Sequence, residues 1–170
     1  MKALFVLLTG LSLVTALSAA TPKAGDAAPK VQAKDQDGNL WKLSDQIGKK
    51  VVLLYFYPKD DTPGCTKQAC GLRDQMGSLQ KDGVSVVGVS RDDAESHKKF
   101  HGKFKLNFPL LVDTDGKLTE AFSVAMDGRP MSRRVSFLIG LNGKILHVTD
   151  NPDAQVHLTE MYLAIAKLPK

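Results

Sequence analysis

The amino-acid sequence predicts an α/β fold in which a mixed β-sheet carries helices on both faces. Residues 51–57 and 84–90 are continuous apolar, β-branched runs, which suit central strands covered on both sides. A stretch of helical character, 65–80, separates them, and strand, helix, strand in this order implies a right-handed parallel crossover. The 150 residues that follow residue 20 are enough for one domain with its own core.

The other elements follow in order along the chain. Residues 31–43 predict an N-terminal hairpin, because Asp37-Gly38 suits a tight primed turn. Residues 92–101 predict a charged helix capped by Asp92 or Asp93. The later elements are a strand at 110–112, a short helix at 118–122, a hairpin of 133–139 and 144–148 about Asn142-Gly143, and an amphipathic helix at 156–168. With no internal repeat and no linker, we expect one domain over residues 21–170.

The first twenty residues have the three-part layout of a secretory signal peptide. Lys2 gives a positive start, an apolar stretch runs to Leu17, and residues 18–20 (Ser-Ala-Ala) provide small side chains before a cut after Ala20. A retained membrane anchor is the alternative, but polar residues and a glycine interrupt the run, which falls short of the ~20 apolar residues that a spanning helix needs. We therefore expect residues 1–20 to be removed. The mature protein is expected in the periplasm, with no stable membrane association.

The composition argues against several classes of protein. The formal net charge of +5 becomes +4 without Lys2, which is too mild to argue for nucleic-acid binding. Two cysteines exclude a disulfide-rich scaffold. Because the periplasm is oxidising, this pair must be judged with disulfide formation in mind.

The loop between the first buried strand and its helix holds the most reactive residues. Cys65 follows a loop that contains Pro58 and Pro63, and it opens a helix. Unpaired backbone N–H groups and the positive end of the helix dipole stabilise a thiolate there, and the thiolate is the reactive form of cysteine. Thr62 lies three residues earlier, close enough for its hydroxyl to donate to the sulfur or to a ligand.

A permanent disulfide between Cys65 and Cys70 is the structural alternative, and helix geometry weighs against it. Five residues of one helix give a rise of ~7.5 Å and place the two Cα atoms about 8.6 Å apart, whereas a disulfide tolerates at most ~7 Å. The bond would require the first turns of the helix to unwind, and so short a loop would stabilise by only roughly 2 kcal/mol. Two cysteines that meet only after local unfolding suit a redox cycle better than a permanent structural disulfide.

The motif Pro58-x-x-x-Thr62-Pro63-Gly64-Cys65-x-x-x-x-Cys70 closely resembles the peroxiredoxins, in their bacterioferritin-comigratory-protein or peroxiredoxin Q branch. The likeness extends over nearly all of residues 25–168. Further matching segments are 89–100, 107–113 and 134–139. The resemblance implies a thioredoxin-like fold and thiol-dependent reduction of hydrogen peroxide and organic hydroperoxides, with no cofactor and no metal.

The resemblance also implies a role for each matching residue. Cys65 matches the peroxidatic cysteine, which becomes a sulfenic acid, and Cys70 matches the resolving cysteine, which condenses with it to an intramolecular disulfide. Pro58 and Thr62 match the loop that shapes the peroxide pocket, and Arg134 matches the arginine that supports the thiolate. A thioredoxin-like or other dithiol is the expected reductant. Because the partner cysteine is in the same chain, we expect an atypical 2-Cys enzyme that is a monomer.

Several other polar or aromatic residues are expected to have structural roles. His97 and His101 have the i, i+4 spacing that a metal can use, but no carboxylate or cysteine is positioned beside them, so we expect a solvated helix face. Trp41 is expected to pack against the core. Arg133 would point to the opposite side of a strand from its neighbour Arg134.

Three other functions stay open. A periplasmic thiol–disulfide oxidoreductase usually carries Cys-x-x-Cys, whereas four residues separate the cysteines here. A copper-binding redox chaperone would use soft cysteine ligands and a distal histidine, but it does not explain the Pro58–Thr62 frame. A structural binding module with an incidental disulfide predicts an unreactive Cys65.

Overall fold

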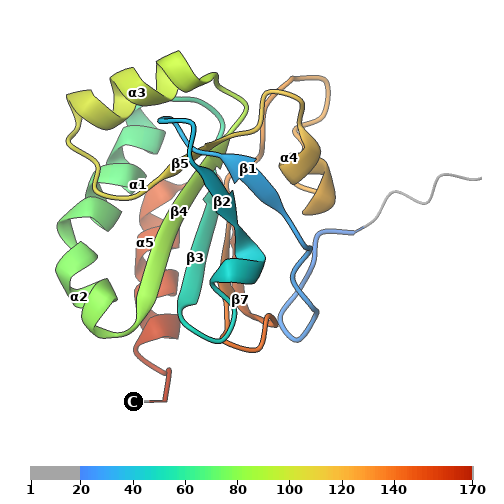
Figure 1. Ribbon diagram of the computed structural model, residues 1–170, viewed down its shortest axis with the longest axis vertical. Helices are drawn as coiled ribbons and strands as arrows, with labels where there is room; N and C mark the ends of the chain where they lie inside the picture. Colours follow the sequence, from blue (N-terminus) through green and yellow to red (C-terminus); the bar gives the residue numbers. More distant parts are fainter. Residues whose placement is uncertain (1–19, 170) are drawn as a thin grey trace, which may run out of the picture.

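The computed structural model describes residues 20–169, so the predicted signal peptide, apart from its last residue, lies outside the described residues. A five-stranded mixed sheet runs through the centre in the order β5-β4-β3-β6-β7 (Figure 1). Its strands are β3 (Val51–Phe56), β4 (Val84–Ser90), β5 (Leu110–Val112), β6 (Val135–Ile139) and β7 (Ile145–Asp150). The β3, β4 and β5 strands are mutually parallel, whereas β6 is antiparallel to both of its neighbours. The α/β fold with a mixed sheet is therefore confirmed.

Helices and the N-terminal hairpin cover opposite faces of this sheet (Figure 1). One face carries α1 (Pro63–Asp74), α2 (Met76–Lys81), α3 (Ala94–Lys103) and α5 (Ala154–Ile165). The other face carries β1 (Gln32–Lys34), β2 (Leu40–Lys42), the 3-10 turn Leu43–Asp45 and α4 (Lys117–Ala121). Every residue of β3 is buried, because its side chains alternate between the two core clusters. Trp41 packs against the hairpin-side cluster, as expected.

The topology gathers three connections at one edge of the sheet. The carboxyl ends of the parallel strands β3 and β4 meet there, with Phe56 paired to Val89. The antiparallel strand β6 begins at the same edge, because Val135 also pairs with Phe56. Open α/β sheets bind ligands outside the carboxyl ends of their parallel strands. The segment before α1, the segment after β4 and the segment before β6 therefore face one another at this edge.

The sequence predicted one helix over 65–80, whereas the structure has two helices there. The predicted helix is divided into α1 and α2 at Gln75, whose φ and ψ of −95° and 1° are not helical. The side-chain amide of Asn107 donates to the carbonyl of Arg73 in the last turn of α1, at 3.3 Å. This contact satisfies one of the carbonyls that lose their partner where a helix ends. The break lets both buried residues of α2, Met76 and Leu79, reach the core.

Both predicted hairpins are present, but their turns are not of the primed type. Positive φ occurs at Gly38 and Gly143 and not at the residue before either glycine, whereas a type I′ turn needs it at both positions. In the first hairpin, the carboxylate of Asp35 accepts from the backbone N–H groups of Asp37 and Asn39, which holds a wider turn.

The caps explain where α3 and α5 begin. Asp93 is the N-cap of α3 and accepts from the backbone N–H of Ser96 at 2.8 Å, so the helix starts at residue 94 and not at 92. Asp153 accepts from Gln155 in the same way, and α5 starts two residues before its predicted first residue. Within residues 20–169, no helix is long and apolar enough to cross a membrane.

Candidate active site

Cys65 lies in the first turn of α1 and is 1% exposed. Thr62 is the N-cap with an extended backbone, and Pro63 occupies the first helical position, where its missing N–H costs nothing. The backbone N–H of Cys65 is therefore among those that a helix leaves unpaired at its start. The sequence predicted this placement, and it favours a negative charge on the sulfur.

Arg134 brings its guanidinium to this sulfur. Its Nη2 donates to Cys65 Sγ at 3.3 Å, and its Nη1 donates to the Gln68 side chain at 2.7 Å. Its Nε donates to the carbonyl of Pro152 at 3.0 Å, so all three nitrogens are held. Gly64 leaves room for this approach, since a Cβ there would lie 3.1 Å from Nη2. Arg134, which is 9% exposed, therefore presents a fixed guanidinium to Cys65.

Arg133 lies on the other side of the chain, as the strand alternation predicted. Its guanidinium pairs with the carboxylate of Asp150 and donates to the Thr21 hydroxyl and the Ser123 carbonyl. Of the two neighbouring arginines, only Arg134 contacts Cys65 among the hydrogen bonds of the described residues.

A chain of hydrogen bonds continues from Arg134 into the core. Gln68 donates from its Nε2 to Ser136 Oγ at 3.3 Å, and Ser136 lies 2.7 Å from His157 Nδ1. His157 Nε2 lies 2.7 Å from the carbonyl of Asn151, which can only accept. The proton of a neutral His157 is therefore on Nε2, and Nδ1 accepts from Ser136.

His157 is suited to the neutral form that this chain requires. Burial lowers the pKa of His157, and the nearby Arg134 guanidinium lowers it further, against an opposing contribution from the Asn151 carbonyl. With His157 neutral, Arg134 donates to Gln68, Gln68 donates to Ser136, and Ser136 donates to His157. All of these hydrogen bonds therefore run in the same direction. We call Arg134, Gln68, Ser136 and His157 the arginine relay.

Thr62 and Pro58 lie in the loop before α1. Thr62 donates its hydroxyl to the carbonyl of Lys59 at 3.0 Å, and not to the sulfur as one expectation had it. The hydroxyl oxygen keeps its lone pairs, and the bond fixes its direction. Pro58 is half-buried and follows Tyr57, the last residue of the buried run. No hydrogen bond among the described residues joins this loop directly to Cys65.

Cys70 lies in the same continuous helix as Cys65, five residues later, as predicted. Both cysteines are free thiols, and Cys70 is the more exposed of the two. In a regular helix this spacing puts the two Cα atoms beyond the distance that a disulfide tolerates. A bond between them requires α1 to unwind locally.

The expectation that His97 lies on a solvated helix face is wrong. His97 is 0% exposed, and its Nδ1 lies 2.8 Å from Asp60 Oδ2 in the loop before α1. Its Nε2 lies 3.2 Å from the carbonyl of Leu111 in β5. His97 therefore ties the loop, α3 and the sheet together. The sequence spacing suggests His101 as the partner of His97. In the folded protein its partner is the carboxylate of Asp60, 37 residues away in the sequence.

Asp60 is the centre of this second polar cluster. It accepts from the Tyr57 hydroxyl at 2.7 Å and from the Ser96 hydroxyl at 2.8 Å, in addition to its pairing with His97. Its backbone N–H donates to Asp92 at 2.9 Å. Burial raises the pKa of Tyr57 well above its ordinary value, so its hydroxyl keeps the proton that it donates. We call Asp60, His97, Tyr57 and Ser96 the loop clamp.

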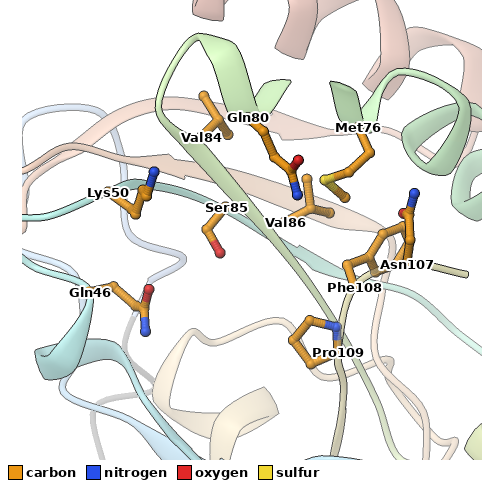
Figure 2. A pocket seen from close by; sticks show the side chains of 10 residues that line it. All are labelled: Gln46, Lys50, Met76, Gln80, Val84, Ser85, Val86, Asn107, Phe108 and Pro109. Carbon is orange, nitrogen blue, oxygen red and sulfur yellow. The ribbon is translucent and has the colours of Figure 1, made fainter. Parts of the chain in front are cut away.

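Two cavities differ in their relation to Cys65. Figure 2 shows one of about 430 Å³ at the amino end of β4, where Val84, Ser85 and Val86 line it. It contains none of the predicted site residues and lies at the opposite end of the sheet from the start of α1. The second, of about 250 Å³, is lined by Pro58 and Lys59 at the edge where α1 begins. No group of three His, Cys, Asp or Glu side chains is arranged to hold a metal ion in residues 20–169.

Comparisons with known proteins match most of this chain. The AhpC/TSA family model matches residues 24–148. Peroxiredoxin Bcp of Escherichia coli K12 is 50% identical over 135 residues, which are 76% of this chain and 86% of that protein. The chloroplastic peroxiredoxin Q of japonica rice is 43% identical over 128 residues, or 75% of this chain and 58% of that protein.

Solved structures of similar proteins have the same fold. Peroxidoxin BcpB from Mycobacterium tuberculosis superposes with a TM-score of 0.81 at 29% identity, covering 88% of this chain and 99% of that one. Peroxiredoxin Q from Xanthomonas campestris superposes with a TM-score of 0.74 at 30% identity, covering 80% and 89%.

Proposed function

Because the chain belongs to the AhpC/TSA family and is a peroxiredoxin, a thiol-dependent peroxidase with a thioredoxin-type fold, we propose that Cys65 is its peroxidatic cysteine and Cys70 its resolving cysteine. The substrates are hydrogen peroxide and organic hydroperoxides. The observation that carries the proposal is the contact of Arg134 with the sulfur of Cys65 at the start of a helix.

In the first step, the Cys65 thiolate attacks the terminal oxygen of the peroxide. The S–O bond forms as the O–O bond breaks, and the leaving oxygen takes a proton to become water or an alcohol. Cys65 becomes a sulfenic acid, oxidised by two electrons. The guanidinium of Arg134 and the N–H groups at the helix start stabilise the charge that moves onto the leaving oxygen. Preorganised donors of this kind act strongly because they do not reorient during the reaction.

In the second step, the Cys70 thiol condenses with the sulfenic acid. A disulfide forms between Cys65 and Cys70, and water leaves. The first turns of α1 must unwind for the sulfurs to meet. An external dithiol, such as a thioredoxin-type protein, then exchanges with this disulfide, returns both thiols and is itself oxidised. Since this cycle needs one chain, we infer that the enzyme works as a monomer of the atypical 2-Cys type.

Two cysteine variants test these roles. Cys65→Ser is expected to consume no peroxide. Cys70→Ser is expected to react once and stop at a sulfenic acid, which dimedone traps and mass spectrometry detects at Cys65. In the oxidised wild type, a two-dalton loss should map to a Cys65–Cys70 link. Full turnover by Cys65→Ser, or an oxidised wild type without this link, contradicts the assignment.

The same assays separate the proposal from the two redox alternatives. A thiol–disulfide oxidoreductase would reduce insulin without consuming peroxide, and a copper chaperone would bind Cu(I) stoichiometrically and lack peroxidase activity. Neither is favoured by the family match.

We further propose that residues 1–20 export the protein and that the mature enzyme acts in the periplasm. The support is the charged, apolar and small-residue layout of that segment. Cell fractionation with N-terminal sequencing of the purified protein tests it. A mature chain that begins near Thr21 in the periplasmic fraction is expected, and a full-length chain in the cytoplasmic fraction would contradict it.

A further inference from the structure

The start of α1 has few contacts that keep it helical. Thr62 forms no side-chain cap, because its hydroxyl donates to a loop carbonyl, and Pro63 has no N–H. In contrast, α3 and α5 each begin with an aspartate that accepts a hydrogen bond from the helix. Arg134 contacts Cys65 and Gln68 in the first turns of α1, and oxidation of the sulfur changes the first of these contacts. The start of α1 is therefore the end from which the helix unwinds.

The other end of α1 is tied to distant parts of the chain. The hydroxyl of Tyr162 in α5 donates to the carbonyl of Gly71 at 3.0 Å. The side chain of Asn107 donates to the carbonyl of Arg73 at 3.3 Å. The guanidinium of Arg73 donates in turn to the carbonyl of Phe104, where α3 ends. Carbonyls in the last turn of a helix lack partners within the helix, so these contacts hold an end that would otherwise fray.

The contact between Tyr162 and Gly71 is part of the packing of α1 on α5, which lie side by side on one face of the sheet (Figure 1). A Cβ at Gly71 would lie 2.6 Å from Cδ1 of Leu158, so a larger residue there would push the two helices apart. The N–H of Gln75, which a continuing helix would direct to Gly71, bonds instead to the carbonyl of Arg73. Tyr162 therefore provides the hydrogen bond that the Gly71 carbonyl loses at the end of the helix.

Tyr162 keeps the proton that it donates. Burial raises the pKa of Tyr162 to about 12, and the negative charge of Asp74 contributes in the same direction. The anchored carbonyl of Gly71 directly follows Cys70, which is only partly buried and is a free thiol. The anchor therefore lies one residue from the cysteine that must meet Cys65.

We propose that Tyr162 is a positioning residue for the second step, because its bond to Gly71 holds the turn that carries Cys70 while the start of α1 unwinds and brings Cys65 to it. This inference rests on the proposed function and deepens it, since it assigns part of the disulfide-forming step to a residue outside the cysteine motif. The bond is made before and after the start of α1 unwinds, so it does not oppose the release of Cys65. It confines the movement to one cysteine and keeps the other thiol within reach.

A single turnover separates the two steps. Reduced protein is mixed with one equivalent of hydrogen peroxide in a quenched-flow instrument, and mass spectrometry counts the dimedone-trapped sulfenic acid and the Cys65–Cys70 disulfide at each time. In Tyr162→Phe the Cys65 thiol is expected to disappear at the wild-type rate. The disulfide is expected to form about two- to tenfold more slowly, the effect of one hydrogen bond. An unchanged rate of disulfide formation would overturn the inference. A faster rate would overturn it too, because the bond would then restrain unwinding.

Tyr55→Phe is the matched control. It removes a buried tyrosine hydroxyl that has no hydrogen-bond partner within residues 20–169, and both steps are expected to keep their wild-type rates. Asn107→Ala removes a second contact at the anchored end of α1 and is expected to slow disulfide formation in the same sense as Tyr162→Phe. If Tyr55→Phe slowed disulfide formation as much as Tyr162→Phe, loss of a hydroxyl from the core would be the cause, and the anchor would be excluded.

The reactivity of Cys70 tests the anchor without the redox cycle. In Cys65→Ser, alkylation of Cys70 by iodoacetamide is expected to become about two- to tenfold faster when Tyr162→Phe is added, because the turn that carries Cys70 opens more often. An unchanged alkylation rate would overturn the inference. A wild type that consumes no peroxide contradicts the proposed function. A wild type that completes the cycle no differently from Tyr162→Phe contradicts only the role of Tyr162.

Discussion

His157 and His97 are both fully buried, yet they occupy opposite electrostatic settings. His157 lies between a hydroxyl and a backbone carbonyl, and burial lowers its pKa, which keeps it neutral. His97 lies between the carboxylate of Asp60 and a backbone carbonyl, so both of its ring nitrogens face acceptors. Since the Leu111 carbonyl only accepts, the short contact between His97 and Asp60 needs a proton of its own.

The difference separates two tasks. The arginine relay is neutral apart from Arg134 itself, so the charge that faces the Cys65 sulfur comes from one guanidinium whose direction neutral groups fix. The loop clamp contains a buried acid–base pair, and that pair fixes the backbone of the loop that precedes α1. In the arginine relay the charge acts on the reacting sulfur, whereas in the loop clamp it holds the conformation of the loop.

The largest effect is expected from removing the acid of the loop clamp. Asp60→Asn leaves His97 buried opposite a neutral amide, and breaking a buried pair in this way costs about 3–5 kcal/mol in the free energy of unfolding. Urea unfolding followed by circular dichroism measures it. A loss below about 1 kcal/mol, the range of exposed pairs, would show that the clamp is not an acid–base pair in the folded protein.

The next effect concerns rate. Arg134→Gln removes the guanidinium that contacts Cys65 Sγ and is expected to lower the rate constant for peroxide by about 10²–10³, as loss of one preorganised donor does. Arg133→Gln is the matched control, because that side chain lies on the other side of the chain, and it is expected to retain the wild-type rate. Stopped-flow measurement with hydrogen peroxide compares the two. Equal losses in both variants would mean that general charge, and not the contact, accelerates the reaction.

The stability of the protein is expected to depend on pH through His157. The pKa of His157 in the folded protein is lowered from its ordinary value, chiefly by burial. As pH falls below about 6.5, the unfolded chain binds a proton here that the folded protein does not, so stability decreases until the pH reaches the folded pKa. The slope is at most about 1.4 kcal/mol per pH unit. Above about pH 6.5 this contribution is fully present.

His157→Gln isolates this contribution, because other acids and histidines titrate in both proteins. The variant is expected to lose less stability than the wild type between neutral and mildly acidic pH, as measured by urea unfolding at each pH. A parallel decline in the two proteins would place the acid sensitivity at groups other than His157.

Sequence reasoning could predict those parts of the site that depend on local spacing. Cys65 at a helix start follows from the loop and Pro63. Strand alternation predicts that Arg133 and Arg134 point to opposite sides, and the choice of Arg134 came from the family resemblance. Gln68 and Ser136 were missed although simple signals exist. Gln68 lies three residues after Cys65 on a helix, and Ser136 lies two residues after Arg134, on the same side of the chain.

The partners from distant elements could not be predicted in this way. His157 meets Ser136 only because α5 docks on the sheet, and His97 meets Asp60 only because α3 lies against the loop. A histidine among lysines and serines has the pattern of a solvated face, and burial is decided by tertiary packing. The division of the predicted helix at Gln75 has the same origin, since Asn107, which contacts the end of α1, is 34 residues from its partner.

The smallest effect is expected at the exposed neighbour of the clamp. Lys103 pairs with Asp61 at 2.6 Å, and both side chains are about half-exposed, so solvent screens the pair. Lys103→Gln is therefore expected to change the unfolding free energy by about 0–1 kcal/mol and to leave the peroxide rate unchanged. The exposed pair of Lys103 with Asp61 and the buried pair of His97 with Asp60 both join the loop before α1 to α3, and their acids are neighbours in the sequence. Comparison of Lys103→Gln with Asp60→Asn therefore separates the effect of burial from that of position. If Lys103→Gln were as destabilising as Asp60→Asn, tethering of the loop to α3 would matter, and not the buried acid–base pair.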